Sequence, residues 1–250
     1  KPTFIDIEDA SWMWGILITD KDRVSTTGIC NFPSHMGSLN YGYASVGGWR
    51  RISPKLYNQI PESDVRKGWF LDDTGVSVNL PAAAQAYITK KGAPVYTQVK
   101  YGPMNDEWGS NNNATDVILM RVEEMYLIKA EAQAMNNDVS GGVNTLNSFV
   151  NTYRDPSYKC TATTGEAVQE AVWHQRRIEF WGEGLAYFDI MRLNKGVNRL
   201  GCGFPKTAVF NIAAGDPVQI YSIPNKEVQY NPLLENNPLV SAPTPIPDEE

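Results

Sequence analysis

The sequence predicts a mainly α-helical fold joined to a large loop-rich region, and three observations support this. Apolar residues recur at helical spacing between about residues 113 and 200, as they do on the buried face of a helix. Residues 1–112 are rich in Gly, Pro, Asn and Tyr and show little sustained periodicity. Prolines recur after Gly201, and proline cannot continue a helix. We therefore expect a loop-rich aromatic region over 1–112, a helical region over 113–200 and an extended wrapping tail over 201–250.

The first region offers only short elements. An apolar run from Trp12 to Ile18 is broken only by Gly15, so we expect a short strand or helix through Trp12–Thr19, with Trp12 and Trp14 in the core. A second short strand is expected around Val95–Tyr101. The remainder reads as ordered loop, and long ordered loops in a compact domain usually carry function.

The helical region begins with a predicted helix that runs to about Asn136. Either Thr115 or Asp116 can cap it, since both side chains accept hydrogen bonds from free amides. Its alanines are small enough for close approach of another helix. A second helix is expected from about Val143 to Tyr153, and the short connection predicts that the two are antiparallel neighbours.

A third helix is predicted to begin near Thr164, in a sequence that resembles a capping box. Its apolar stripe continues through Ile178 and Leu185. Gly182 and Gly184 interrupt it, and each glycine costs about 1 kcal/mol against alanine inside a helix. We therefore expect a kink or a break there, followed by a fourth short helix to about Asn194.

The composition narrows the class of protein. The chain has 250 residues, 42% of them hydrophobic and 20% charged, which is typical of a folded protein. The net charge is −6 and no run of Lys or Arg exceeds two residues, so a nucleic-acid partner is not expected. The longest apolar run is far shorter than the roughly 20 residues that span a bilayer.

The cysteines and histidines predict neither a disulfide framework nor a metal or cofactor site. The cysteines are Cys30, Cys160 and Cys202, and the histidines are His35 and His174. They are widely separated and show no metal-ligand spacing. His174 reads as a packing residue, and Asp72 with Asp73 offers at most a weak cation site.

Glu179 and Glu183 are the residues that most suggest chemistry. They lie four residues apart, and two neighbouring carboxylates are typical of a glycosidase acid and base. The other interpretation is structural: Arg176 neutralises Glu179, and Asp189 with Arg192 extends an ion network. Flanking arginines lower a carboxyl pKa, whereas a catalytic acid needs a raised one. We favour the structural network and predict no catalytic residue.

The aromatic loops are the candidate ligand surface. Five of the seven tryptophans lie before residue 110. Flat aromatic rings can cover the apolar C–H face of a sugar with little loss of side-chain entropy, while neighbouring polar groups bind its hydroxyls. Two stretches, 40–51 and 105–112, combine both kinds of residue. The predicted ligand-binding residues are Asn40, Tyr41, Tyr43, Trp49, Arg50 and Trp108.

Five sequence blocks, in order, resemble motifs of the SusD/RagB family of outer-membrane glycan-binding lipoproteins of Bacteroidetes. The family patterns are Leu-Tyr with Asp-x-Arg, Arg-x-x-Glu with Ala-Glu-Ala, Leu-Asn-x-x-Arg, a Glu-rich helix end, and Ile-Pro with repeated Asn-Pro. The matching blocks of this sequence are Leu56–Tyr57 with Glu62–Lys67, Lys100–Tyr101 followed by Ile118–Ala132, Leu146–Asn147 with Arg154, Arg176–Arg192, and Ile223–Pro238. Ala186–Tyr187 and Trp173–His174 depart from the pattern.

This resemblance implies a SusD-like fold, with tetratricopeptide-like helix pairs and a loop-rich face for the glycan. Family members carry a lipid anchor and form a lid on a SusC-like TonB-dependent transporter of the outer membrane. Residues 1–250 look like the C-terminal part of such a domain, with the lipid anchor outside this chain. The family motifs mark the scaffold, so none of them supplies a binding residue.

The resulting expectation is a non-catalytic, cell-surface binder that delivers an oligosaccharide to its transporter. Two alternatives stay open. One is a glycoside hydrolase or lyase that uses Glu179 and Glu183, and the other is a peptide-binding member of the same family.

Overall fold

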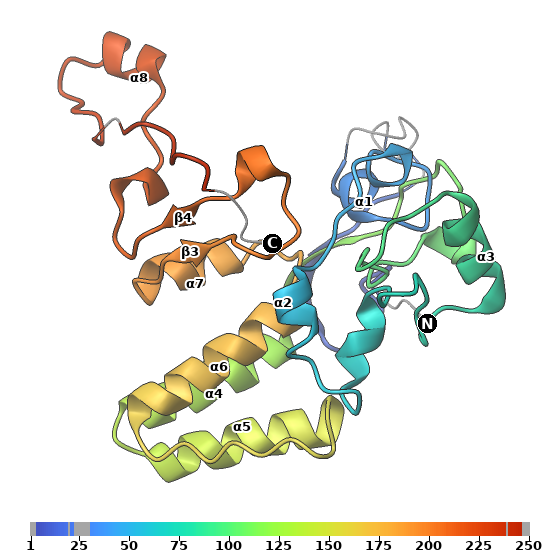
Figure 1. Cartoon of the computed structure of the whole chain (residues 1–250), viewed down its shortest axis with the longest axis horizontal. Coiled ribbons are helices and arrows are strands. Elements are labelled where there is room, and N and C mark those ends of the chain that lie inside the picture. Colours follow the sequence, from blue (N-terminus) through green and yellow to red (C-terminus); the bar gives the residue numbers. More distant parts are fainter. Residues whose placement is uncertain (1–3, 20, 23–30, 239, 247–250) are drawn as a thin grey trace. The chain divides into compact units, whose positions relative to one another are not determined.

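The structure is a computed structural model that describes residues 4–19, 21–22, 31–238 and 240–246. It forms two compact units, Lys1–Glu183 and Gly184–Glu250. The chain is coloured by sequence in Figure 1. We describe each unit by itself.

Three long helices form the regular part of the first unit. Helix α4 (Val122–Met135) packs against both α5 (Val139–Tyr153) and α6 (Gly165–Glu179), as Figure 1 shows. The Thr164 side chain accepts a hydrogen bond from the Ala167 amide, which confirms the predicted start of α6. Helix α5 begins earlier than predicted, because Asp138 caps it by accepting from the Gly141 amide.

The close packing of α4 and α5 depends on a glycine. A Cβ atom on Gly142 would lie 2.7 Å from the Ala130 carbonyl oxygen and 2.9 Å from the Ala134 Cβ atom. Tyr126 and Phe149 then stack across the two helices, with ring centroids 5.4 Å apart. The small residues of α4 therefore admit α5 as the sequence predicts.

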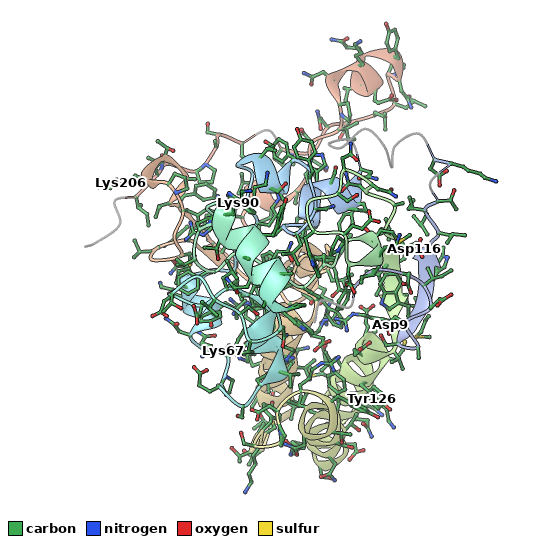
Figure 2. All side chains as sticks on the ribbon, turned by 90° about the vertical axis from the view of Figure 1, so that its right-hand side faces the viewer. Asp9, Lys67, Lys90, Asp116, Tyr126 and Lys206 are labelled. Atoms are coloured by element: carbon green, nitrogen blue, oxygen red, sulfur yellow. The ribbon has the colours of Figure 1, made fainter. Side chains whose placement is uncertain are left out.

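The predicted start of the first long helix is wrong. Strand β2 (Val117–Arg121) precedes α4 and pairs antiparallel with β1 (Trp12–Ile16). Asp116, labelled in Figure 2, does not cap α4. Its carboxylate accepts hydrogen bonds from the Ile7 amide at 2.9 Å and the Ile18 amide at 2.7 Å, and so ties down the chain at both ends of β1.

The short strand or helix expected over Trp12–Thr19 is the strand β1, which ends at Ile16, and the core assignment of Trp14 is wrong. Trp14 is 63% exposed, because the pairing of β1 with β2 shifts register between Trp12 and Trp14, and such an irregularity breaks the alternation of faces along a strand. Trp12 is half-buried and its ring lies 6.3 Å from that of Phe4. Residues 95–101 make isolated bridges through Thr97, Gln98 and Tyr101 in place of the predicted strand.

Short helices and turns make up the rest of the first unit, as the composition predicts. The helices are α1 (Phe32–Met36), α2 (Pro54–Tyr57) and α3 (Ala82–Lys90), and the 3-10 turns are η2 (Ala44–Val46), η3 (Val65–Trp69) and η4 (Met104–Asp106). They enclose two apolar clusters. One joins α2 to α6 and comprises Ile52, Leu56, Tyr57, Ile60, Phe70 and Ile178. The other, which we call the α3 cluster, comprises Leu39, Leu71, Ala84, Ile88 and Val99.

The chain breaks after α6 where the glycines predict it. Gly182 has φ +80° and Gly184 has φ +84°, a left-handed conformation that costs glycine little. The second unit then begins with α7 (Ala186–Arg192), which ends close to the predicted residue.

The second unit is less extended than its prolines predict. Strands β3 (Val197–Asn198) and β4 (Asn211–Ile212) pair antiparallel. The 3-10 turn η5 (Lys206–Ala208) lies between these strands, and the 3-10 turn η6 (Pro217–Gln219) and helix α8 (Asn225–Tyr230) follow them. In the tail, a side chain satisfies the backbone groups that a strand would otherwise pair. The Ile223 amide donates to the Asn236 side-chain oxygen at 2.8 Å, and the Asn236 side-chain amide donates to the Ile223 carbonyl oxygen at 3.1 Å. Within the described residues, no helix has the length and apolar character that crossing a membrane requires.

Candidate functional site

The two aromatic stretches singled out in the sequence lie side by side. The Tyr41 amide donates to the Ser110 carbonyl oxygen at 2.8 Å, and the Gly109 amide donates to that of Leu39 at 2.9 Å. The Asn113 side-chain amide adds a bond to the Tyr41 carbonyl oxygen at 3.1 Å. Residues 39–50 and 104–113 therefore form one surface, which we call the joined loops.

Asn40 lies inside this junction. Only 3% of it is exposed, and its side-chain amide donates to the Asn113 side-chain oxygen. Its main-chain oxygen accepts from the Tyr87 hydroxyl at 3.4 Å. The geometry gives Asn40 a part in holding the loops together.

Tyr41 and Tyr43 are the most open of the predicted residues, at 44% and 47% exposed. The Tyr43 ring stacks on His35 from α1, with centroids 5.0 Å apart and an interplanar angle of 25°. The Arg50 guanidinium lies 5.4 Å from the same ring and donates to the Gly48 carbonyl oxygen at 2.9 Å. Tyr43 is thus held in one orientation before any ligand arrives, which lowers the entropy lost on binding.

Trp49 and Trp108 are half-buried and pack against the α3 cluster. Each ring is anchored by apolar residues yet keeps part of its surface open. The structure therefore brings Tyr41, Tyr43, Trp49, Arg50 and Trp108 to the same pair of loops, from two segments about sixty residues apart in sequence.

Two supporting residues were missed in the sequence. From the sequence, His35 was considered only as a possible metal ligand. Its position against the Tyr43 ring is set by helix α1, to which it belongs. The capping box between Asn31 and Ser34 that starts α1 was a usable signal. Tyr87 packs on the α3 cluster, and a Cβ atom on Gly109 would lie 2.7 Å from its ring. Gly109, with φ +85°, therefore lets the second loop close over Tyr87.

Glu179 and Glu183 lie elsewhere, in a buried ion cluster. Glu179 is fully buried. Its carboxylate accepts from Arg66 at 3.1 Å, from Arg121 at 2.6 Å, and from Arg154 at 2.8 Å. Burial alone would raise the pKa of Glu179, but these arginines, Arg121 first, hold it well below its usual range. A carboxyl in this state does not donate a proton near neutral pH.

Glu183 binds the same cluster. It accepts from Arg121 Nε and Nη2, both at 2.9 Å, and pairs with the Lys100 ammonium. Lys100 also donates to the main-chain oxygens of Glu179 at 2.9 Å and Trp181 at 3.1 Å. Desolvation lowers the pKa of Lys100 to about 8, against the opposing pull of Glu183.

The predicted network was right in kind and wrong in its members. Arg176 reaches Glu124 on α4 at 3.1 Å, and the guanidinium groups at Glu179 come from Arg66, Arg121 and Arg154. Arg176 and Glu179 are three positions apart and share a helix face, but the fold brings other arginines closer to the Glu179 carboxylate. Asp189 and Arg192 pair with each other at 2.8 Å within α7 of the second unit.

The other chemically suggestive residues add no reactive centre. Burial, with the charge of Arg177 next, lowers the pKa of His174. Cys160 is buried and Cys202 is half-buried, and Cys30 lies outside the described residues. No group of three or more His, Cys, Asp or Glu side chains suited to a metal ion occurs in the part of the chain that the structure describes.

Fold and site together define a helical scaffold that presents a rigid aromatic loop surface. A sequence model of the SusD family matches residues 61–239. The chain therefore belongs to the SusD family. No curated protein matches the chain in a sequence search.

Solved structures of the same superfamily share the fold. A SusD superfamily protein of Bacteroides thetaiotaomicron has 23% identity and a TM-score of 0.68, and the match covers 92% of this chain and 49% of that one. A Bacteroides vulgatus member has 20% identity and a TM-score of 0.67, with 91% and 46% covered. A SusD-like carbohydrate-binding protein of the same species has 25% identity and a TM-score of 0.60, with 90% and 40% covered. The chain thus spans about half the length of these relatives.

We predict that Glu179→Gln strongly destabilises the protein. The substitution leaves Arg66, Arg121 and Arg154 buried around a neutral amide, and breaking a buried ion pair on one side costs about 3–5 kcal/mol. Urea unfolding followed by circular dichroism measures the change. The control is Glu8→Gln, which removes an exposed carboxylate and is expected to change stability by less than about 0.5 kcal/mol. Equal stabilities of the two variants would contradict the structural interpretation of Glu179.

We predict that the contribution of Glu179 to stability depends on pH in the acid range. The pKa of Glu179 is lowered on folding, so its stabilisation is present above the unfolded-state pKa of about 4.3 and is lost as the pH falls below that value. We therefore expect the melting temperatures of wild type and Glu179→Gln to differ most near neutral pH. The gap should narrow from about pH 4 down to about pH 3. Thermal melts across this range test it, and a constant gap would contradict the assignment.

Proposed function

We propose that this chain binds an oligosaccharide at the cell surface, without covalent chemistry, and delivers it to a SusC-like TonB-dependent transporter of the outer membrane. The observation that carries the proposal is the rigid platform of Tyr43 on His35, beside Tyr41, Trp49 and Trp108 on the joined loops. Membership of the SusD family and the likeness to a SusD-like carbohydrate-binding protein support a glycan as the ligand.

The arrangement suits a sugar for physical reasons. Exposed aromatic side chains offer a large apolar area that can cover the C–H groups of a pyranose ring. The Arg50 guanidinium lies over the Tyr43 ring, and its remaining N–H donors can bind sugar hydroxyls. Because these side chains are fixed by His35 and by the α3 cluster, little ordering is required on binding.

Anchoring and handover belong to the same proposal. In this arrangement a lipid anchor holds the protein to the outer membrane, and the transporter receives the bound glycan. Nucleic acid is not a partner in this proposal, because the net charge of −6 provides no positive footprint.

We predict that Tyr43→Ala weakens glycan binding about tenfold, which corresponds to about 1.4 kcal/mol. The loss follows from removing an aromatic face that is exposed and already oriented. Isothermal titration calorimetry against a panel of soluble oligosaccharides measures the affinity, with a peptide panel in parallel.

The matched control is Tyr230→Ala, which removes a tyrosine that is 85% exposed on α8 of the second unit. It should leave affinity unchanged. Trp49→Ala and Trp108→Ala require a stability measurement alongside, because both rings also pack on the α3 cluster. Unchanged glycan affinity in Tyr43→Ala, or binding of peptides alone, would refute the assignment.

Hydrolysis or elimination by Glu179 and Glu183 is the competing activity. A catalytic acid has to reach the glycosidic oxygen and to be protonated near neutral pH. Glu179 is fully buried and held ionised by three arginines. We therefore expect no release of reducing ends from any glycan that binds. Turnover that disappears in Glu179→Asp, a variant that keeps the charge, would favour the enzyme.

A further inference from the structure

A second hollow in the first unit shares none of the predicted ligand residues. It is a cavity of about 500 Å³, lined by residues of α2, η3, the turn after η3 and Tyr96. Lys67, labelled in Figure 2, lines it on the η3 side. The volume falls within the range of about 300–1,000 Å³ that is typical of small-molecule sites.

The aromatic wall of this cavity contains a strained residue. The rings of Tyr57 and Tyr96 lie 5.1 Å apart at an angle of 55°. Tyr96 has φ +65°, a conformation that is unfavourable for a bulky side chain and that concentrates at ligand sites. It is held there by two backbone hydrogen bonds, to the Leu71 carbonyl oxygen at 3.1 Å and from the Ile52 amide at 3.0 Å.

The charge of the lining is unbalanced. Four carboxylates, Glu62, Asp64, Asp72 and Asp73, line the cavity with a single ammonium, that of Lys67. Lys67 pairs with Glu62, and Arg66 pairs with Asp64 at 2.6 Å. Asp72 and Asp73 are the two lining carboxylates outside these ion pairs. Within the described part of the chain, no Lys or Arg forms an ion pair with Asp73.

Asp72 stays ionised beside a protonated phenol. Asp72 Oδ1 accepts from the Thr74 hydroxyl at 2.6 Å and from the Thr74 amide at 2.8 Å. These bonds outweigh desolvation and lower the pKa of Asp72. Burial, followed by the charges of Asp72, Glu62 and Asp73, raises the pKa of Tyr57 to about 12. The Tyr57 hydroxyl is therefore available as a donor at neutral pH.

We propose that this cavity is a second ligand site, which binds a sugar ring carrying a free primary ammonium group. Tyr96 covers the ring, and the Tyr57 hydroxyl and the side-chain amides of Asn58 and Asn79 in the lining bind its hydroxyls. Asp72 with Asp73 binds the ammonium. A neutral sugar leaves the two carboxylates unmatched. A lysine side chain matches them but leaves both asparagines without hydroxyl partners. The amino sugar is the ligand class that uses all three parts of the lining.

The experiment is a titration of the whole chain with glucosamine, glucose, N-acetylglucosamine and lysine methyl ester, at about pH 6, where the amines are protonated. Glucosamine should bind about tenfold or more tightly than the other three probes, by the strength of a charge-assisted pair. Equal binding of glucose, N-acetylglucosamine or lysine methyl ester would overturn the proposal, since each lacks one of the recognised features.

Three variants locate the site. Asp73→Asn should reduce glucosamine affinity to that of glucose, whereas Glu8→Gln, an exposed carboxylate elsewhere in the unit, should not. Tyr96→Asn removes the ring and keeps a residue that tolerates positive φ, so binding should fall without unfolding. Tyr43→Ala should leave glucosamine binding unchanged. Loss in Tyr43→Ala would instead place the ligand on the joined loops and refute the second site, whatever the outcome for oligosaccharides there.

Discussion

The burial of the Glu179 carboxylate is the constraint on which the first unit depends. A fully buried charge is tolerated only with close partners, and Glu179 takes them from η3, from the end of β2 and from the residue after α5. These partners lie 113, 58 and 25 residues away in sequence. The three segments therefore have to meet at the end of α6. The motif residues Arg66, Lys100, Arg121, Arg154 and Glu183 all belong to this one cluster.

The parts of the fold that could be predicted are those that depend on neighbours in sequence. Thr164 caps α6 and the glycines after it break the helix, because both effects act within one turn. Strand β2 was missed because its partner, β1, lies about a hundred residues earlier. The apolar residues of Val117–Arg121 fit either a helix or a strand. They form a strand because β1 is available to pair with them. The choice of Arg176 as the partner of Glu179 failed for the same reason.

The candidate site was predictable in composition and unpredictable in geometry. The mixture of aromatic and polar residues singled out both stretches of the joined loops, because binding residues are disproportionately found on loops. Their contact depends on Asn113 and on the backbone bonds of Tyr41 and Gly109, which leave no pattern in a single sequence. Asn40 was predicted as a ligand-binding residue because of its hydrogen-bonding groups. In the structure these groups bind Asn113 and Tyr87 and join the two loops.

The joined loops and the cavity, the two proposed ligand surfaces, are supported by different parts of the first unit. The joined loops rest on the α3 cluster and on the asparagine junction, so their residues can change without disturbing the ions around Glu179. The cavity is built on η3, whose Arg66 enters the ion cluster while its neighbours Asp64 and Lys67 line the cavity. A change in η3 therefore acts on scaffold and cavity together. Under the two proposals, changes of ligand specificity are accordingly expected at the joined loops, and the cavity is expected to change little wherever Arg66 and Glu179 are kept.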